Sequence, residues 1–200
     1  LILAGAAAGV AAAFNTPLAG IVFGIEEMSR AFEVRTSGLI IGTVIAAGLT
    51  SLALVGNYSY FGSSATMLGH GTDWLAVPVC GVVGGLAGGL FSRLVIAMAR
   101  GLPGRLGPLI KRYPIAFAFA CGLAVAVCGF LSGDTIYGTG YSQVKHALES
   151  GTRLPESFGV LKLAATLLST TSGIPGGIFS PSLAVGAGLG SNVAHLFPSA

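Results

Sequence analysis

The stretch TSGLIIGTVIAAGLTSLALVG, residues 36–56, is 21 residues long and carries no charged side chain. A helix of that length rises about 30 Å, which matches the hydrocarbon layer of a bilayer. Two further stretches have the same character. Residues 113–133 are also uncharged, and residues 74–98 carry only Arg93 near the C-terminal end, where its side chain can reach the interface. The sequence therefore predicts three membrane-spanning helices.

The composition points to the same class of protein. Apolar residues make up 53% of the chain and charged residues only 8%, whereas ordinary soluble domains are about 25% charged. The 32 glycines fit a membrane protein, because small residues let transmembrane helices pack closely. The net charge of +3 is small and dispersed, which argues against a nucleic-acid partner.

Apolar segments too short to cross a membrane lie around the predicted spans. They are residues 1–14, 17–25, 158–168 and 179–193. Short, interrupted apolar segments are typical of transporters that keep broken helices around a site near the bilayer midplane. The sequence thus predicts an all-α, multi-pass transmembrane protein with broken and tilted helices. The chain starts inside an apolar run without a basic signal region, and we expect it to be part of a longer polypeptide.

The basic residues predict the orientation. The connection 57–73 contains no Lys or Arg, whereas the connection 100–112 contains four, and Arg30 and Arg35 precede the first span on the same side. Cytoplasmic loops of membrane proteins are enriched in Lys and Arg. We therefore expect Arg30, Arg35 and residues 100–112 on the cytoplasmic side, and residues 57–73 on the outer side.

Glycine spacing predicts where helices pack. Two rows of glycines recur at four-residue spacing: Gly81, Gly85 and Gly89, and Gly84 and Gly88. Such a ridge lets a second helix approach to backbone contact. We interpret it as a packing surface.

The residues that would mark an enzyme or a metal site are not arranged for either. The three cysteines lie in apolar runs and are interpreted as small packing residues: Cys80, Cys121 and Cys128. The three histidines form no HExxH motif: His70, His146 and His195. No GxSxG motif occurs either. The sequence thus predicts no catalytic residue, metal or cofactor. A membrane-embedded enzyme is the competing class, which hydrolysis without anion flux would reveal.

The first segment that suggests chemistry is GAAAGVAAAFNTPLAGIVFGIEEM, residues 5–28. Thr16 followed by Pro17 predicts the start of a new helix, which ends near Glu26 and Glu27. Acids at a helix C-terminus oppose its dipole by about 0.3–1 kcal/mol, and burial in a membrane costs more. An ionisable group there is a candidate for proton transfer. The alternative is that the pair marks where the helix leaves the membrane, paired with Arg30.

The second such segment is STTSGIPGGIFSPSLAVG, residues 169–186. Gly176 and Gly177 precede an apolar helical run, and glycine allows a ligand to approach the backbone. The N-terminus of a helix offers unpaired N–H groups and partial positive charge, which favour an anion. The alternative is an ordinary turn between two helices.

Together these two segments resemble the CLC family of chloride channels and chloride/proton antiporters. Residues 177–181, GIFSP, match the family's GxFxP anion-binding motif, and residues 5–28 match the segment that leads to its internal glutamate. The likeness covers essentially the whole chain. It implies that residues 1–200 are part of a single CLC-type transmembrane domain with an inverted-repeat fold, from the end of the first repeat through much of the second.

The resemblance also implies residue roles. The backbone N–H groups of Ile178 and Phe179 would bind chloride, and Glu27 would transfer protons, with Glu26 as its neighbour. The family's anion-binding serine, external gating glutamate and pore tyrosine are expected outside this chain. Ser172 is not assigned as that serine, and Ile174 stands where the family commonly has Ala.

The implied function is transmembrane chloride transport by chloride/proton antiport, in an integral protein of the cell or inner membrane. A passive voltage-gated chloride channel and a fluoride/proton antiporter are the alternatives. The implied partners are chloride ions, protons, the lipid bilayer and a second copy of the protein. The homodimer would join through the helix that ends at Ile25 and the helix that follows it, together with later helices.

Overall fold

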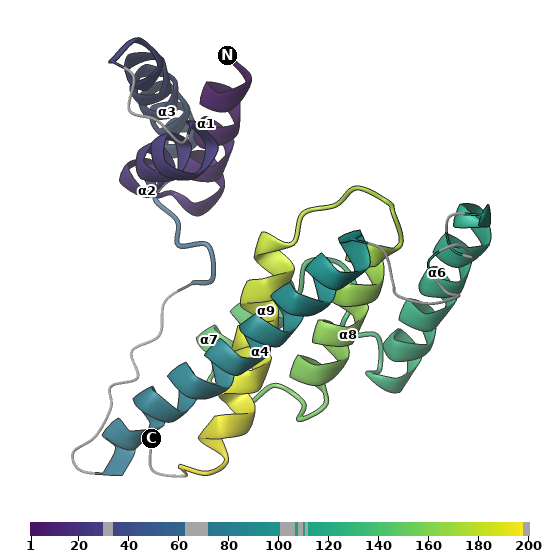
Figure 1. Cartoon of the computed structure of the whole chain (residues 1–200). Coiled ribbons are helices and arrows are strands. Elements are labelled where there is room, and N and C mark those ends of the chain that lie inside the picture. Colours follow the sequence, from purple (N-terminus) through teal and green to yellow (C-terminus); the bar gives the residue numbers. More distant parts are fainter. Residues whose placement is uncertain (30–33, 63–71, 101–106, 108–109, 111, 198–200) are drawn as a thin grey trace. The chain divides into compact units, whose positions relative to one another are not determined.

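The computed structural model describes residues 1–29, 34–62, 72–100, 107, 110 and 112–197. The chain divides into two compact units, Leu1–Ser63 and Ser64–Ala200. Every regular element within the described ranges is a helix (Figure 1). The prediction of an all-α protein is therefore confirmed.

Each unit consists of a few helices. The first unit holds α1 (Ile2–Phe14), α2 (Pro17–Phe23), a six-residue π-helical turn η1 (Gly24–Ser29) and α3 (Val34–Val55). The second begins with a short 3₁₀ turn, η2 (Thr72–Leu75). It continues with α4 (Ala76–Arg100), α6 (Pro114–Leu131), α7 (Tyr141–Ser150), α8 (Phe158–Thr171) and α9 (Phe179–Ala194).

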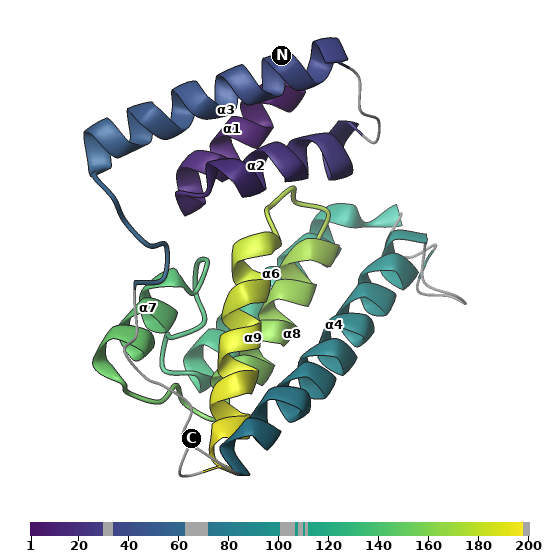
Figure 2. The ribbon, with the colours of Figure 1, turned by 90° about the vertical axis from the view of Figure 1, so that its left-hand side faces the viewer.

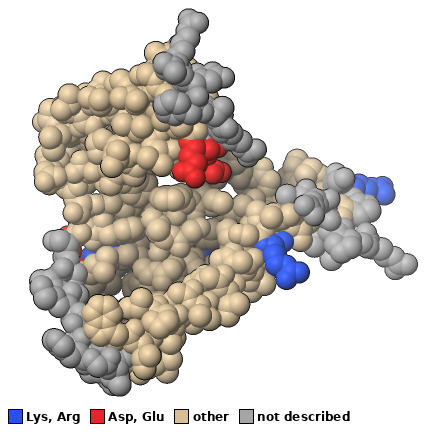
Figure 3. All heavy atoms as spheres, turned by 60° about the vertical axis from the view of Figure 1, so that its left-hand side comes forward, with Lys and Arg blue, Asp and Glu red and all other residues tan. Residues whose placement is uncertain are grey.

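Three helices of the described residues are long and apolar enough to cross a membrane. They are Ser37–Val55, Ala76–Ala97 and Pro114–Leu131, which confirms the three predicted spans to within a few residues. Many of their large side chains are exposed, such as Leu86 and Phe119. Figure 3 shows one face, on which acidic and basic side chains are few and most of the surface is uncharged. Such surfaces suit lipid or further transmembrane helices.

Half of the basic residues behind the predicted orientation lie outside the described part of the chain. They are Arg30, Arg105 and Lys111, and much of the connection 57–73 lies outside the described residues as well. The orientation therefore stays a prediction from the sequence.

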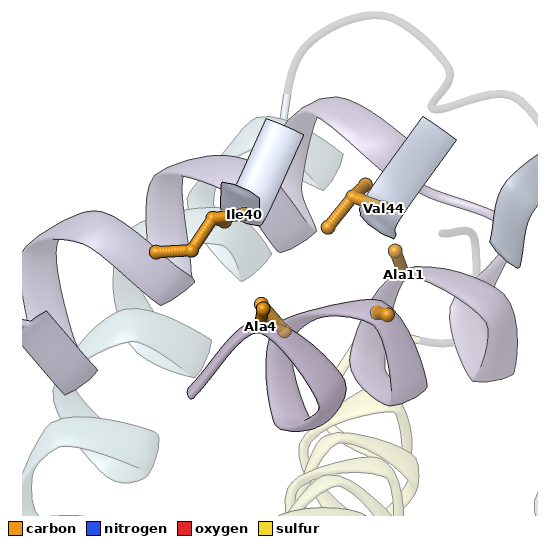
Figure 4. Close-up of a cluster of buried hydrophobic side chains, with 6 residues drawn as sticks. Ala4, Ala11, Ile40 and Val44 are labelled. Atoms are coloured by element: carbon orange, nitrogen blue, oxygen red, sulfur yellow. The ribbon is translucent and has the colours of Figure 1, made fainter. Parts of the chain in front are cut away.

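Small side chains let the helices of the first unit pack closely. Ile40 and Val44 of α3 face a row of buried alanines on α1 (Figure 4): Ala4, Ala7, Ala8 and Ala11. The helix α2 also packs closely on α1, because a Cβ on Gly20 of α2 would lie 2.6 Å from the Cβ of Ala11. Only glycine fits at that crossing.

A left-handed residue separates α1 from α2. Asn15 has φ 52°, a conformation that asparagine adopts more readily than most residues. Its side-chain amide donates to Asn57 Oδ1 at 2.8 Å and to the Tyr58 carbonyl at 3.0 Å. The next helix has Thr16 as its N-cap and a proline in its first turn, as predicted, although the Thr16 side chain makes no capping hydrogen bond.

The second unit is built around α8, which contacts α9, α6 and α4. The helices α8 and α9 lie side by side, with α4 next to them (Figures 1 and 2). Their backbones meet at two glycines, since a Cβ on Gly188 would lie 2.6 Å from Gly159 Cα. In turn, a Cβ on Gly159 would lie 2.8 Å from the backbone nitrogen of Leu189. This crossing was not predicted from the sequence.

The predicted glycine ridge on α4 is open in the described part of the chain. A Cβ on Gly81, Gly85 or Gly89 would meet nothing within 4 Å there. The cysteines that were interpreted as packing residues differ in their burial: Cys121 is buried, whereas Cys80 is exposed. Packing inside the chain therefore accounts for Cys121 and leaves Cys80 without that explanation.

Candidate functional site

The predicted anion-binding residues lie at the start of α9. Ile178 is the N-cap and Phe179 the first residue of this 16-residue helix, and both are exposed. The Ser182 N–H donates to the Ile178 carbonyl at 3.0 Å, so the first turn is formed. The N-terminal end of an α-helix carries partial positive charge. The structure thus places both predicted residues where a helix favours an anion.

The two glycines before α9 have no structural need to be glycine within the described chain. A Cβ on Gly176 or Gly177 would meet nothing within 4 Å, and neither has the positive φ that is found at Gly173. Glycine still leaves the backbone accessible to a ligand or to another segment. Their surroundings are compatible with the predicted anion site.

A cavity of about 480 Å³ lies beside this helix start, between α6, α8 and the segment 172–181. Gly176 and Gly177 form part of its wall. Its hydroxyl-bearing lining residues are Thr139, Thr166, Ser169, Thr170 and Ser172. The Ser172 hydroxyl donates to the Ser169 carbonyl at 2.7 Å and accepts from the Ile174 N–H at 3.3 Å. Ser172 thus takes part in hydrogen bonds of its own loop.

Lys162 also lines this cavity, and sequence reasoning missed it. It lies in α8 and is only 2% exposed. Its Nζ donates to the carbonyls of Ile136 and Gly138, each at 2.6 Å. The signal that could have found it is a single lysine in an otherwise apolar or hydroxyl-bearing helix, FGVLKLAATLLSTT.

Glu26 and Glu27 lie in the π-helical turn η1 that continues α2. Both are exposed, and they stand near the end of the helical segment, as predicted. Turns of this type are wider than α-helical ones and are frequent at functional sites. The turn starts against α1, because a Cβ on Gly24 would lie 2.7 Å from Ala7 Cβ. The alternative partner, Arg30, lies outside the described residues.

The structure brings Ile178 and Phe179 together at one helix start, whereas Glu27 belongs to the other compact unit. The chloride-binding role of Ile178 and Phe179 and the proton-transfer role of Glu27 stay predictions from the sequence.

The described residues contain no group of three or more His, Cys, Asp or Glu side chains that could hold a metal ion. His195 Nδ1 lies 3.1 Å from Arg153 Nη1, and His146 Nδ1 lies 3.4 Å from the Ser150 hydroxyl. His70 lies outside the described residues. The two described histidines thus have nearby polar partners of an ordinary kind.

Comparison with known proteins adds an independent observation. The profile of the family described as "Voltage gated chloride channel" matches residues 1–200. The protein named "Voltage-gated ClC-type chloride channel ClcB" of Escherichia coli O9:H4 (strain HS) is 32% identical over 196 residues, which cover 94% of this chain and 44% of that protein. The protein of the same name from Salmonella typhimurium (strain LT2) is 33% identical over 193 residues, covering 94% and 45%. The chain thus spans less than half the length of these curated relatives. No solved structure gives a significant match.

Proposed function

This chain belongs to the voltage-gated chloride channel family, and from that premise we propose that the full-length protein exchanges chloride for protons across a membrane. The chain is part of an integral membrane protein, as its family and its three apolar helices show. The observation that carries the chloride half of the proposal is the exposed start of α9 at Ile178 and Phe179, next to two glycines and a cavity.

Chloride would be held at this site by dipoles. The segment from 169 to 186 contains no charged residue, so the backbone N–H groups at Ile178 and Phe179 supply the attraction. A helix terminus stabilises an anion by about 0.3–1 kcal/mol at an exposed site and by up to about 2 kcal/mol when partly buried. Conduction needs a site that binds well enough to be entered and weakly enough to be left. A helix start without a full positive charge in its own segment meets both requirements.

The proton half of the proposal rests on Glu27. Its carboxyl group can gain and lose a proton, and its exposed position on a wide helical turn gives it access to a proton donor. The predicted orientation puts that turn on the cytoplasmic side. Glu26 points in a different direction from the same turn, since adjacent helical residues do not share a face.

A second copy of the protein is part of the proposal. The helix that leads to Ile25 and the helix α3 expose large apolar side chains, among them Leu18, Val22 and Leu49. Buried against a partner, such residues stabilise a dimer by close packing. This surface supports a homodimer that joins through α2 and α3.

Passive chloride conduction is the second candidate. It is favoured by the name of the relatives, which calls them voltage-gated chloride channels. The reversal potential under a pH gradient separates the two candidates. A passive channel ignores the gradient, whereas an exchanger shifts its reversal potential with it.

The direct test is Glu27→Gln in the full-length protein, reconstituted in liposomes, with Glu26→Gln as the matched control. Glutamine keeps the shape and removes the exchangeable proton. We expect proton uptake driven by a chloride gradient to fall to the level of protein-free liposomes in Glu27→Gln, while chloride flux continues. Glu26→Gln should keep both. Undiminished proton movement in Glu27→Gln would remove Glu27 from the proposal and require another proton route. Wild-type protein that carries chloride but no protons would instead favour the passive channel.

A further inference from the structure

Lys162 is a buried charge that the proposed exchange does not use. The helix around it is otherwise apolar or hydroxyl-bearing, and its side chain is only 2% exposed. A buried ammonium group costs free energy unless hydrogen bonds or charges compensate it. A lysine at this position therefore does something that an apolar residue of the same length would not do.

The ammonium group of Lys162 holds the loop between α6 and α7. Its bonds to the Ile136 and Gly138 carbonyls reach the segment 132–140, in which four residues have a left-handed backbone: Gly133, Asp134, Gly138 and Gly140. A segment with such a backbone forms no continuous helical ladder. Its buried carbonyl groups need another donor, and Lys162 is that donor.

The same loop is packed against α9. A Cβ on Gly140 would lie 2.6 Å from the Cβ of Ala184 and 3.3 Å from Lys162 Cε. Ala184 is fully buried and belongs to the second turn of α9. Loop, lysine and the early part of α9 thus form one packed layer. A change at Lys162 can reach the start of α9 through direct contacts.

The charge of Lys162 also faces little compensation. Among the described residues that line the cavity of about 480 Å³, Lys162 alone carries a formal charge. The ion pair found in the described part of the chain joins Lys145 and Glu149 on α7 and does not involve Lys162. A unit charge about 10 Å from an anion, at an effective dielectric constant of about 20, changes the affinity for that anion about ten-fold. In the described part of the chain, the printed acceptors of the ammonium group are two carbonyl oxygens, which carry no formal charge.

We propose that Lys162 is a positioning residue that sets the affinity for the anion at the start of α9. Its ammonium group fixes the loop 132–140 against α9, and its charge favours a monovalent anion in the cavity that Gly176 and Gly177 border. The inference rests on the proposed binding of chloride, but not on proton coupling.

The test compares three variants of Lys162 in the full-length protein. Lys162→Met removes the charge and the hydrogen bonds, Lys162→Gln removes the charge but keeps a donor, and Lys162→Arg keeps both. Lys145→Met, on the exposed face of α7, is the matched control. The half-saturating chloride concentration and the maximal rate are measured by chloride flux in liposomes, and chloride affinity is measured by calorimetry on the purified protein.

We expect Lys162→Met and Lys162→Gln to raise the half-saturating chloride concentration about ten-fold, with a smaller change in maximal rate. Lys162→Arg should stay near the wild type, and Lys145→Met should not change. Wild-type affinity in Lys162→Gln would overturn the role of the charge, and equal loss in Lys162→Arg and Lys162→Met would reduce the residue to a packing role. If Lys162→Met does not fold, the Arg and Gln variants still show whether the charge sets the chloride affinity.

The wild-type protein separates this inference from the proposed function. If it binds chloride in the calorimeter but moves none, the proposed exchange is refuted and the variants still test the role of Lys162. If it binds no chloride, the proposed exchange and the role of Lys162 are both overturned.

Discussion

The helix α9 contains glycines in two opposite settings. At its start, Gly176 and Gly177 border a cavity, and an added Cβ would meet nothing within 4 Å. In its middle, Gly188 lies against the backbone of Gly159, and an added Cβ would lie 2.6 Å from Gly159 Cα. The sequence alone does not distinguish these settings. The first leaves backbone accessible, whereas the second uses the absence of a side chain to bring two helices together.

This difference has a consequence for the proposed site. A helix start binds an ion well only when its N–H groups keep their direction, because ordering them at the moment of binding costs affinity. The close crossing at Gly159 and Gly188 fixes α9 on α8, and the packing of Gly140 against Ala184 adds a second contact. The packed middle of the helix therefore keeps the exposed start in place.

The largest expected effect comes from the packed setting. Gly188→Ala places a methyl group against backbone atoms that cannot move aside as a flexible side chain can, and overpacking of this kind costs about 1–3 kcal/mol. Gly190→Ala on the same helix is the matched control, because its Cβ would meet nothing within 4 Å. We expect the thermal unfolding midpoint of the full-length protein in detergent to fall in Gly188→Ala alone. Equal midpoints would show that the two helices are less tightly packed than the described contacts indicate.

Much of the fold could be predicted because its signals are local. An uncharged run of 21 residues specifies a membrane-spanning helix by length alone, and Thr16 followed by Pro17 specifies where α2 starts. The π-helical turn at Gly24 was not predicted. It stands where Gly24 packs on Ala7, and this contact between two helices has no signature in the sequence around Glu27.

The helix crossing and the lysine could not be predicted, since their partners are distant in the chain. The spacing of Gly81, Gly85 and Gly89 predicts a packing ridge, yet the crossing between two glycines that the described residues show joins Gly159 and Gly188. Lys162 binds carbonyl oxygens 24 and 26 residues away. Backbone carbonyls belong to every residue, so no residue type marks them as partners. The residues proposed to bind the anion could be singled out because their motif is short and contiguous, and their role stays a prediction.

A moderate effect is expected at the open setting. Gly177→Ala adds a methyl group that meets no described atom within 4 Å, so the thermal midpoint should stay close to that of the wild type. The same methyl group stands where chloride would approach the backbone of Ile178. Losing a contact with a helix terminus weakens binding about two- to five-fold. Calorimetry with chloride measures this loss, and Gly190→Ala again serves as the control. Loss of stability without loss of affinity would reverse the distinction between the two settings.

The smallest effect is expected on α4, whose glycine ridge extends the comparison to a third setting. A Cβ on Gly85, like one on Gly177, would meet no described atom within 4 Å. Unlike Gly177, Gly85 does not line the cavity beside the start of α9. Alanine is favoured over glycine inside a helix by about 1 kcal/mol. We therefore expect Gly85→Ala to leave chloride affinity unchanged and to raise the thermal midpoint of the full-length protein slightly, or leave it as it is. A clear fall in the midpoint would mean that another helix closes on the ridge, as its four-residue spacing predicts, and Gly85 would then join Gly188 among the packed glycines.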